Sequence, residues 1–190
     1  MAEKKISCWG RFCGWWLRKK GWTRDSEYMP EKRAIVLGVP HTSFKDFIIS
    51  YLFSASYGKT THVMIKKESF FFPVGVFLRA VGCIPVDRSN STALVKSLID
   101  AMNKEEEFYL AIAPEGTRKA VKRWKAGFAF IAKETGIPVY AGYFDWGTKH
   151  IGIGEKLELT GDPKEDVKLV QAHYAKLNLV GKHPEGYTAQ

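Results

Sequence analysis

The chain has 190 residues, a formal net charge of +9, 45% hydrophobic and 14% aromatic residues. This length suits one domain with a sizeable core, and the composition excludes collagen-like and disordered proteins. The positive charge predicts anionic partners, a class that includes nucleic acid, phospholipid surfaces and phosphorylated substrates.

The three cysteines are Cys8, Cys13 and Cys83. They form no Cys-x-x-Cys pair, and their odd number argues against a disulfide scaffold, so we expect a reducing, intracellular compartment. No apolar run approaches the roughly 18 residues of a membrane-spanning helix. The N-terminal region contains Arg11 and lacks a small-residue cleavage site, so we expect no signal peptide.

The first predicted element is an amphipathic helix over residues 4–20. Apolar side chains recur at helical spacing, and they are Ile6, Trp9, Cys13, Trp16 and Leu17, with Phe12 and Trp15 beside them. Four of the six tryptophans lie in the first 22 residues, and the first 24 residues carry seven Lys and Arg side chains against one Glu. We therefore expect Trp9, Trp15 and Trp16 to contact an anionic membrane surface. The alternative is a terminal helix that docks its apolar side on the domain.

Residues 25–33 are polar, contain Pro30 and predict a linker. After them, strand-like and helix-like runs alternate. Strands are predicted over residues 34–39, 62–65, 83–86, 108–113, 139–146 and 151–153. Helices are predicted over residues 46–57, 73–81, 92–103, 126–135 and 165–177. This alternation predicts a single α/β domain with a central, mostly parallel or mixed sheet flanked by helices.

His41 and Asp46 form the first polar cluster. They follow a predicted strand and Pro40, at a strand end of the kind where α/β sheets bind ligands. Histidine accepts a proton near neutral pH, and a carboxylate on its other ring nitrogen fixes the tautomer. Thr42 and Ser43 are candidate caps for the helix that follows. On this pair alone, a capping Asp and an incidental His remain the alternative.

A second cluster runs from Gly82 to Arg88 and ends a predicted strand in an arginine. A guanidinium at a strand end is well shaped to hold a phosphate through two hydrogen bonds. The alternative is a surface arginine paired with Asp87.

A third cluster, Pro114 to Arg118, also lies just past a strand. Gly116 allows a sharp turn, Arg118 can bind an anion, and Glu115 can orient it. Further basic side chains follow at Lys119, Lys122, Arg123 and Lys125. The alternative is a solvated charge run. A nucleotide-binding loop is disfavoured because Gly-x4-Gly-Lys-Ser/Thr is absent.

Each cluster lies beyond a predicted strand, so we expect all three to converge on one edge of one sheet. Together they supply a base, a carboxylate to orient it and two arginines. The chain lacks a Ser or Cys nucleophile with its own base. No His, Cys or Asp cluster has metal-ligand spacing, so we expect no metal.

In order and spacing these clusters resemble the motifs of the glycerolipid acyltransferases, of the lysophosphatidate acyltransferase type. That family carries His-x4-Asp, Gly-x-Ile-x-Val-Asp-Arg, Pro-Glu-Gly-Thr-Arg and an apolar strand around Ile-Pro-Val. The corresponding segments here are His41–Asp46, Gly82–Arg88, Pro114–Arg118 and Ile137–Val139. The resemblance covers about residues 34–145.

The resemblance implies an O-acyltransferase that forms no acyl-enzyme. His41 would deprotonate an acceptor hydroxyl, which attacks the thioester of acyl-CoA or acyl carrier protein, and Asp46 would hold the imidazole. The substrate-binding residues it implies are Lys67, Arg88, Glu115, Gly116, Thr117 and Arg118. Lys67 and the backbone amides near Ser43 are candidate donors to the oxyanion. No cofactor is expected beyond the acyl co-substrate.

The resemblance also divides the chain into a membrane-surface helix, residues 1–24, and an acyltransferase domain, residues 34–180. The expected partners are an anionic membrane surface, the acyl thioester and a lysophospholipid, with 1-acylglycerol-3-phosphate as the first choice. The expected location is peripheral, on the cytoplasmic face of the inner membrane.

Departures from the family pattern leave alternatives open. Pro40 stands where many members have Asn, and Ala113 where many have Phe. The run Pro40–Ser43, together with Thr160-Gly161-Asp162, resembles a divergent bacterial branch of the superfamily. The acceptor could therefore be a lyso-aminolipid or a sugar lipid instead. A basic nucleic-acid-binding module is the alternative from another class, but no binding motif is recognised, so we expect no nucleic acid partner.

Overall fold

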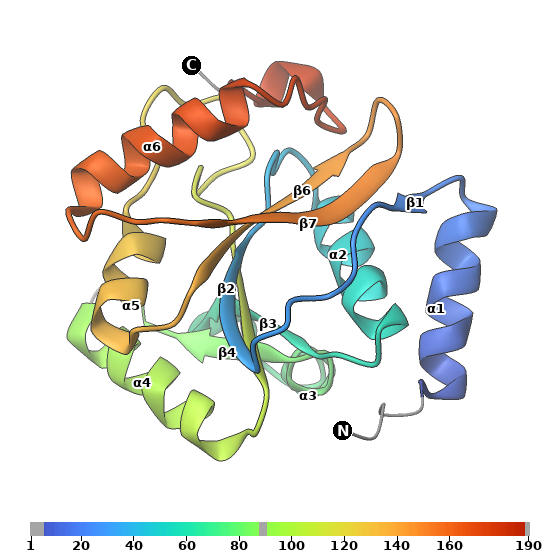
Figure 1. The fold of residues 1–190 in the computed structure, drawn as a ribbon. Helices are drawn as coiled ribbons and strands as arrows, with labels where there is room; N and C mark the ends of the chain where they lie inside the picture. Colours follow the sequence, from blue (N-terminus) through green and yellow to red (C-terminus); the bar gives the residue numbers. More distant parts are fainter. Residues whose placement is uncertain (1–5, 88–90, 189–190) are drawn as a thin grey trace.

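A computed structural model describes residues 6–87 and 91–188 of the chain, although nothing is described of the side chains of residues 91–93. Arg88, which the motifs assign to substrate binding, lies outside the described residues. The chain folds as a single α/β domain with one seven-stranded sheet flanked by helices (Figure 1). The fold class expected from the sequence is confirmed.

The strands lie in the order β1-β7-β6-β2-β5-β3-β4. Their bounds are β1 Thr23–Arg24, β2 Arg33–Leu37, β3 Thr61–Lys66, β4 Cys83–Val86, β5 Phe108–Ile112, β6 Val139–Asp145 and β7 His150–Leu157. All neighbouring pairs are parallel except β6 and β7. Strands β2 to β6 therefore run in one direction, and their carboxyl ends meet at one edge of the sheet.

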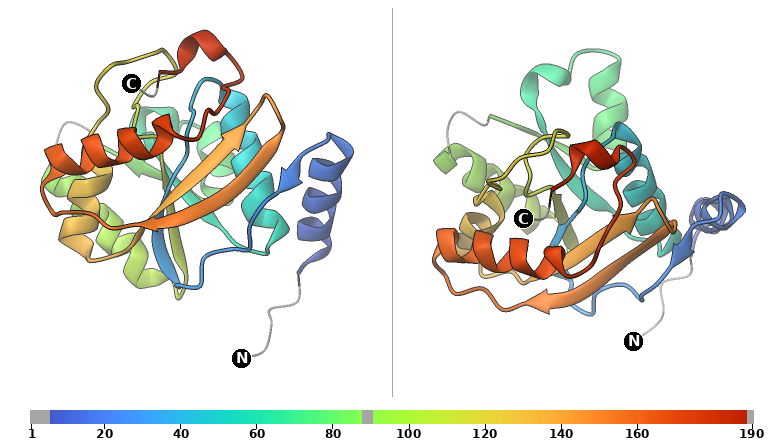
Figure 2. Two further views of the ribbon diagram at one scale, coloured as in Figure 1. Left: turned by 45° about the horizontal axis from the view of Figure 1, so that its top comes forward. Right: turned by 90° about the horizontal axis from the view of Figure 1, so that it is seen from above.

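Helices cover both faces of this sheet (Figure 2). Their bounds are α1 Cys8–Lys19, α2 Phe44–Ser56, α3 Val74–Ala80, α4 Ser91–Lys104, α5 Gly127–Thr135 and α6 Pro163–Ala175, with short 3₁₀ turns η1 Lys67–Ser69 and η2 Pro184–Gly186. Among the described residues, no helix is both long and apolar enough to cross a membrane.

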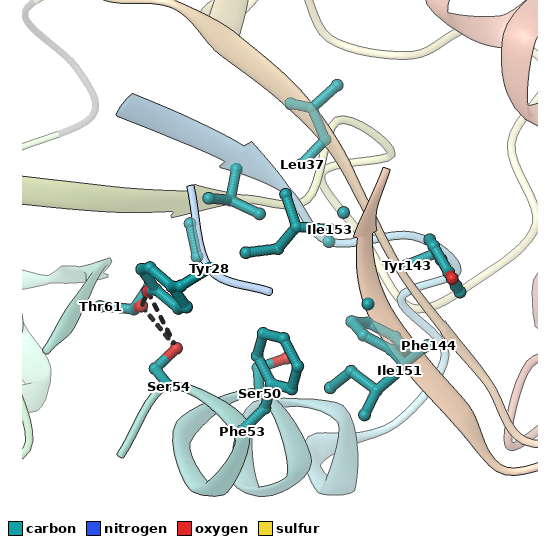
Figure 3. A pocket seen from close by; sticks show the side chains of 15 residues that line it. Tyr28, Leu37, Ser50, Phe53, Ser54, Thr61, Tyr143, Phe144, Ile151 and Ile153 are labelled. Atoms are coloured by element: carbon teal, nitrogen blue, oxygen red, sulfur yellow. Dashed lines mark hydrogen bonds between the residues drawn. The ribbon is translucent and has the colours of Figure 1, made fainter. Parts of the chain in front are cut away.

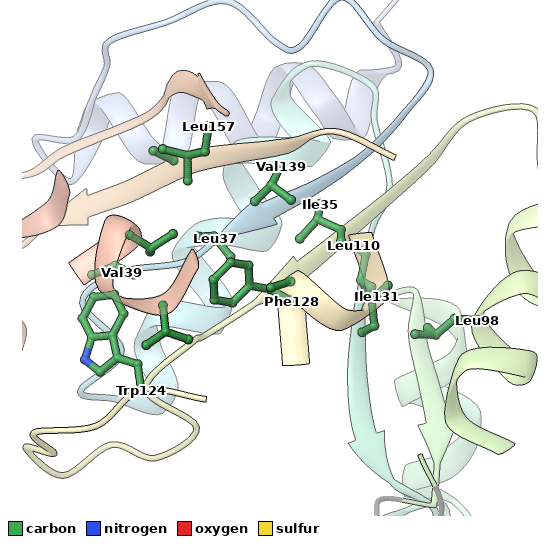
Figure 4. Packing of buried hydrophobic residues seen from close by; sticks show 14 of the residues in the cluster. Ile35, Leu37, Val39, Leu98, Leu110, Trp124, Phe128, Ile131, Val139 and Leu157 are labelled. Carbon is green, nitrogen blue, oxygen red and sulfur yellow. The ribbon is translucent and has the colours of Figure 1, made fainter. Parts of the chain in front are cut away.

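The larger core lies between the sheet and helices α4, α5 and α6. Ile35 and Leu37 of β2 and Leu110 of β5 are fully buried there, and Phe128 of α5 packs against them (Figure 4). Such uninterrupted apolar strands are typical of the centre of a parallel sheet covered on both faces. A second core lies on the opposite face, where α1 and α2 pack around Phe144 and Ile151.

The predicted elements are all present, and their ends shift for local reasons. β4 has the predicted bounds, whereas β7 continues to Leu157 because it pairs with β6 along its length. α2 begins at Phe44, two residues early, because Ser43 caps it. The two-residue strand β1 was not predicted. Residues 25–33 are largely irregular, as expected, but Met29 is buried and Tyr28 packs edge-on against Tyr109.

Two glycines of helix α1, Gly10 and Gly14, face α2. A Cβ atom built on Gly10 would lie 2.6 Å from the carbonyl oxygen of Ala55, a backbone atom that cannot move aside easily. A Cβ atom on Gly14 would meet its nearest neighbour, Cβ of Ser56, at an ordinary 3.5 Å. Gly10 therefore sets the distance between the two helices, and Gly14 does not.

We predict opposite effects for two matched substitutions in α1. Gly10→Ala forces α1 away from α2 and should lower the free energy of unfolding by about 1–3 kcal/mol, the usual effect of overpacking. Gly14→Ala has room for its methyl group and should raise it by up to about 1 kcal/mol, because alanine favours a helix more than glycine. Urea unfolding followed by tryptophan fluorescence measures both; equal effects would contradict the packing described here.

Candidate active site

The turn between β2 and α2 holds His41 and Asp46 together. Ser43 caps α2 and forms a capping box with Asp46, the third residue of the helix. Oδ2 of Asp46 accepts hydrogen bonds from the backbone amides of Thr42, at 2.8 Å, and Ser43, at 2.7 Å. The same oxygen lies 3.4 Å from Nδ1 of His41. The helix cap therefore also places the carboxylate beside the imidazole.

Asp46 is 1% exposed, and its second oxygen is also bonded. Oδ1 accepts a hydrogen bond of 2.8 Å from Nε1 of Trp146, which directly follows β6. The carboxylate thus receives donors from two segments about a hundred residues apart. The imidazole of His41 is 29% exposed and can be reached from outside. Asp46 is thus a buried carboxylate whose two oxygens both accept hydrogen bonds, and it lies beside an accessible imidazole. This is the arrangement expected of a general base and the carboxylate that orients it.

Glu115 joins this pair from the end of the neighbouring strand β5. Both of its carboxyl oxygens lie 3.0 Å from the backbone nitrogen of His41 and accept its hydrogen. Burial raises the pKa of Glu115 to about 8; the His41 amide opposes this shift, and the nearby charge of Asp46 adds to it. Glu115 therefore fixes the backbone of His41 instead of facing solvent.

The residues after Glu115 turn outward. Gly116 has a φ of +68°, a conformation that favours glycine, and a Cβ atom there would lie 2.9 Å from the Lys125 side chain. Thr117 accepts a hydrogen bond from the amide of Lys119, and the side chain of Arg118 is exposed. The third motif thus splits into a buried carboxyl group and an exposed cation.

Lys67 is engaged by another residue, Asp87. Nζ of Lys67 lies 2.7 Å from a carboxylate oxygen of Asp87, a contact that links the ends of β3 and β4, and this bond raises the pKa of Lys67. The backbone amides proposed as oxyanion donors are also engaged, because those of Thr42 and Ser43 donate to Asp46. In this structure these two amides are therefore occupied by Asp46.

A C-terminal segment that sequence analysis missed covers the turn. The amide of His183 donates to the hydroxyl of Thr42 at 3.1 Å. Cβ atoms on Gly181 and Gly186 would lie 2.6 Å from the Thr42 side chain and 2.8 Å from the Arg118 carbonyl oxygen, respectively. Tyr187 follows, and both burial and the charge of Glu115 raise the pKa of its hydroxyl. The sequence of this C-terminal segment has neither helical nor strand periodicity, so its position over the turn could not be predicted.

Trp146 is the other missed residue. Besides its bond to Asp46, its ring meets Trp22 edge-on at 5.0 Å, and the ammonium of Lys182 lies 4.9 Å from the ring centre. The available signal was a tryptophan at the end of the strand predicted over residues 139–146, just beyond the last motif, but this signal is weak on its own.

A narrow cavity lies behind the turn, between α2 and the sheet (Figure 3). Apolar side chains line it, among them Phe53, Phe144 and Ile151, while the hydroxyls of Tyr28, Ser54 and Thr61 form a hydrogen-bonded group on one side. Its volume of about 40 Å³ is room for only a few water molecules. It is too small for a fatty acyl chain.

The helix α1 presents two faces. Cys13 and Leu17 are fully buried against the domain, and Trp16 packs beside them. Trp9 and Trp15 are exposed. One side of α1 therefore packs on the domain, and the other side is exposed.

Among the described residues no group of three His, Cys, Asp or Glu side chains is arranged to hold a metal ion.

The buried Glu115 predicts a pH dependence of stability. Its pKa is raised from 4.5 to about 8 on folding. The contribution of Glu115 to the free energy of unfolding is therefore fully present below about pH 4.5 and is lost as the pH rises through about 8. Between these values the slope approaches about 1.4 kcal/mol per pH unit at most. Glu115→Gln keeps an acceptor for the His41 amide but does not titrate, so its free energy of unfolding should fall less over this range. Urea titrations from pH 5 to 8 test this; parallel curves would contradict it.

Comparison with known proteins identifies the family of the chain. No curated protein matches the sequence. The family model described as Acyltransferase matches residues 22–144, which span β1 to β6 and hold all of the motif segments. This match covers more than half of the chain, and the chain therefore belongs to the acyltransferase family and is an acyltransferase.

Proposed function

We propose that the chain is an O-acyltransferase that moves a fatty acyl group from acyl-CoA or acyl carrier protein to the hydroxyl of a lysophospholipid, with 1-acylglycerol-3-phosphate as the acceptor. The observation that carries this proposal is the linked arrangement of His41, Asp46 and Glu115 at the carboxyl edge of β2 and β5.

In this mechanism His41 is the general base. Its Nδ1 faces Asp46, so Nε2 takes the proton of the acceptor hydroxyl as the oxygen attacks the thioester carbonyl. Asp46 stabilises the imidazolium that results. The tetrahedral intermediate then collapses, the C–S bond breaks, and the thiolate leaves with the proton that His41 returns. No acyl group is attached to the protein.

The exposed cations of the site serve the acceptor's phosphate. Arg118 lies in the turn that Glu115 anchors to His41. By the motif pattern, Arg88 adds a second guanidinium, whereas Lys67 already pairs with Asp87. A guanidinium binds a phosphate through paired hydrogen bonds, so these residues are suited to a phosphorylated lipid.

We also propose that the enzyme is peripheral, at the cytoplasmic face of the inner membrane. The support is helix α1, whose exposed Trp9 and Trp15 lie among basic side chains. Tryptophan and cations of this kind suit the headgroup layer of an anionic membrane.

Replacement of the base tests the mechanism. With purified protein, an acyl thioester and 1-acylglycerol-3-phosphate, His41→Ala should lower kcat by about 10²–10⁴-fold, the usual contribution of a general base. His173→Ala is the matched control, since His173 of α6 also pairs with a carboxylate, that of Glu155 in β7. Equal turnover by wild type and His41→Ala would contradict the assignment.

The same assay decides the acceptor. Transfer to 1-acylglycerol-3-phosphate over a lyso-aminolipid and a sugar lipid supports the proposal. The reverse preference, for which Pro40 and Ala113 are the sequence signals, would keep the chemistry and reject lysophosphatidate.

Trp146 should act as a positioning residue. Trp146→Phe keeps most of the ring but removes the donor to Oδ1 of Asp46. We expect kcat to fall about 10-fold, equivalent to about 1.4 kcal/mol of transition-state stabilisation, with KM within about twofold. Trp22→Phe trims a neighbouring ring, leaves this bond in place and should retain the wild-type kcat. A matching loss in both variants would show that packing alone explains the effect.

A further inference from the structure

The exposed rings of α1 form a continuous row. Trp9 and Phe12 are stacked with centroids 5.5 Å apart, and Phe12 and Trp15 lie 5.6 Å apart. All three are exposed, on the part of the helix that does not pack against the domain. Large apolar side chains gathered in this way on a surface mark an interaction site more often than an ordinary surface.

This row continues onto α2, which lies beside α1 (Figure 1). Nε1 of Trp9 donates to the hydroxyl of Tyr51 at 3.2 Å. Tyr51, Ile48 and Phe44 are spaced three and four residues apart, so they share one face of α2. Ile48 is exposed, and Phe44 is 63% exposed. We call the whole row the aromatic strip; its members are Trp15, Phe12, Trp9, Tyr51, Ile48 and Phe44.

The inner end of the strip is the catalytic turn. Phe44 directly follows Ser43, which caps α2 and whose amide donates to Asp46. The strip therefore leads from the N-terminal helix to the turn that carries His41, without a break in the chain of contacts and helical neighbours.

The charge around the strip identifies its partner. Helix α1 contains Arg11, Arg18 and Lys19 and no acidic residue, and the ammonium of Lys19 lies 4.9 Å from the centre of the Trp15 ring. Helix α2 has Lys45 exposed beside Phe44, and the one acidic residue in this helix, Asp46, is buried. An apolar row flanked by cations alone fits an anionic phospholipid bilayer.

We propose that the aromatic strip lies in the headgroup layer of an anionic bilayer, so that the membrane contact extends along α2 to the catalytic edge instead of stopping at α1. This inference rests on the proposed lipid acceptor. A lysophospholipid could then reach His41 from the bilayer surface without leaving it. The small cavity behind the turn cannot hold the chain, whereas the bilayer can.

A second apolar region lies on α3 and on the segment that precedes it, where Phe72 is 86% exposed and Phe77 is also exposed. Within the described part of the chain, no ring contact or hydrogen bond joins this region to the strip or to His41. We therefore assign the bilayer contact to the strip, and the α3 region serves as the competing site in the test.

Binding to vesicles tests the strip independently of catalysis. The full chain and its variants are sedimented with vesicles of phosphatidylcholine alone or mixed equally with phosphatidylglycerol. Phe44→Glu/Ile48→Glu should weaken partition into the mixed vesicles at least ~10-fold, since both apolar contacts are lost and negative charge is added. The Phe44→Glu change lies in the first turn of α2, where a negative charge stabilises a helix, so it should not unfold α2. Circular dichroism and thermal unfolding verify that each variant is folded, and Ile48→Ser provides a milder second variant.

Phe130→Glu is the matched control, because Phe130 is also exposed but belongs to α5 on the other face of the sheet. It should bind as wild type does. Wild-type binding by folded Phe44→Glu/Ile48→Glu would overturn the proposal. Loss of binding only in Phe72→Glu/Phe77→Glu would also overturn it, because the contact would then lie on α3.

A kinetic assay separates this inference from the proposed function. Ile48→Glu should acylate a short-chain lysophosphatidate dispersed in water within about twofold of wild type, and a long-chain acceptor in anionic vesicles at least ~5-fold more slowly. Equal losses with both acceptors would contradict a membrane role for the strip. If wild type acylates neither acceptor, the proposed function fails, while vesicle binding still decides the strip.

Discussion

The carboxylate of Asp46 is the group on which the site depends. It is buried and receives two backbone amides of its own turn and the indole of Trp146. These bonds hold the first turn of α2 and the end of β6 in one place, and they leave the imidazole of His41 beside a fixed anion. Removing such a carboxylate leaves the buried amide of Thr42 without a partner, at a cost of about 1–3 kcal/mol, and also frees two part-buried donors, the Ser43 amide and the Trp146 indole. The same residue therefore stabilises the helix cap and lies beside the imidazole that we propose as the base.

Around this carboxylate, the parallel sheet supplies the remaining geometry. The ends of β2 and β5 are neighbours, so Glu115 reaches the backbone of His41 although the two are 74 residues apart. The carboxyl group of Glu115 is buried, and the turn at Gly116 then leaves Arg118 exposed. A buried anchor and an exposed cation arise from one short motif because the strand end lies at the boundary between core and solvent.

Much of this architecture follows from the sequence, because alternating apolar runs predict strands and helices, and the motifs follow strand ends. His41, Asp46 and Glu115 were all named as site residues from these motifs. The role expected for Glu115 was to orient Arg118, whereas the structure bonds it to the backbone amide of His41. The roles of Trp146 and of the C-terminal segment could not be predicted, because they depend on contacts across about a hundred residues or more and on close approaches such as that of Gly181 to Thr42. The extension of the apolar surface of α1 onto α2 was likewise hidden until the helices were placed side by side.

The central claim is that His41 and Asp46 act as one catalytic unit. The most direct measurement is kcat/KM for His41→Ala, Asp46→Asn and the double variant, under conditions where each is folded. If Asp46 acts through the imidazole, Asp46→Asn should lower activity in the wild-type background and have almost no further effect once His41 is gone. Losses that multiply in the double variant would contradict the account, since they would mean that the two side chains contribute independently.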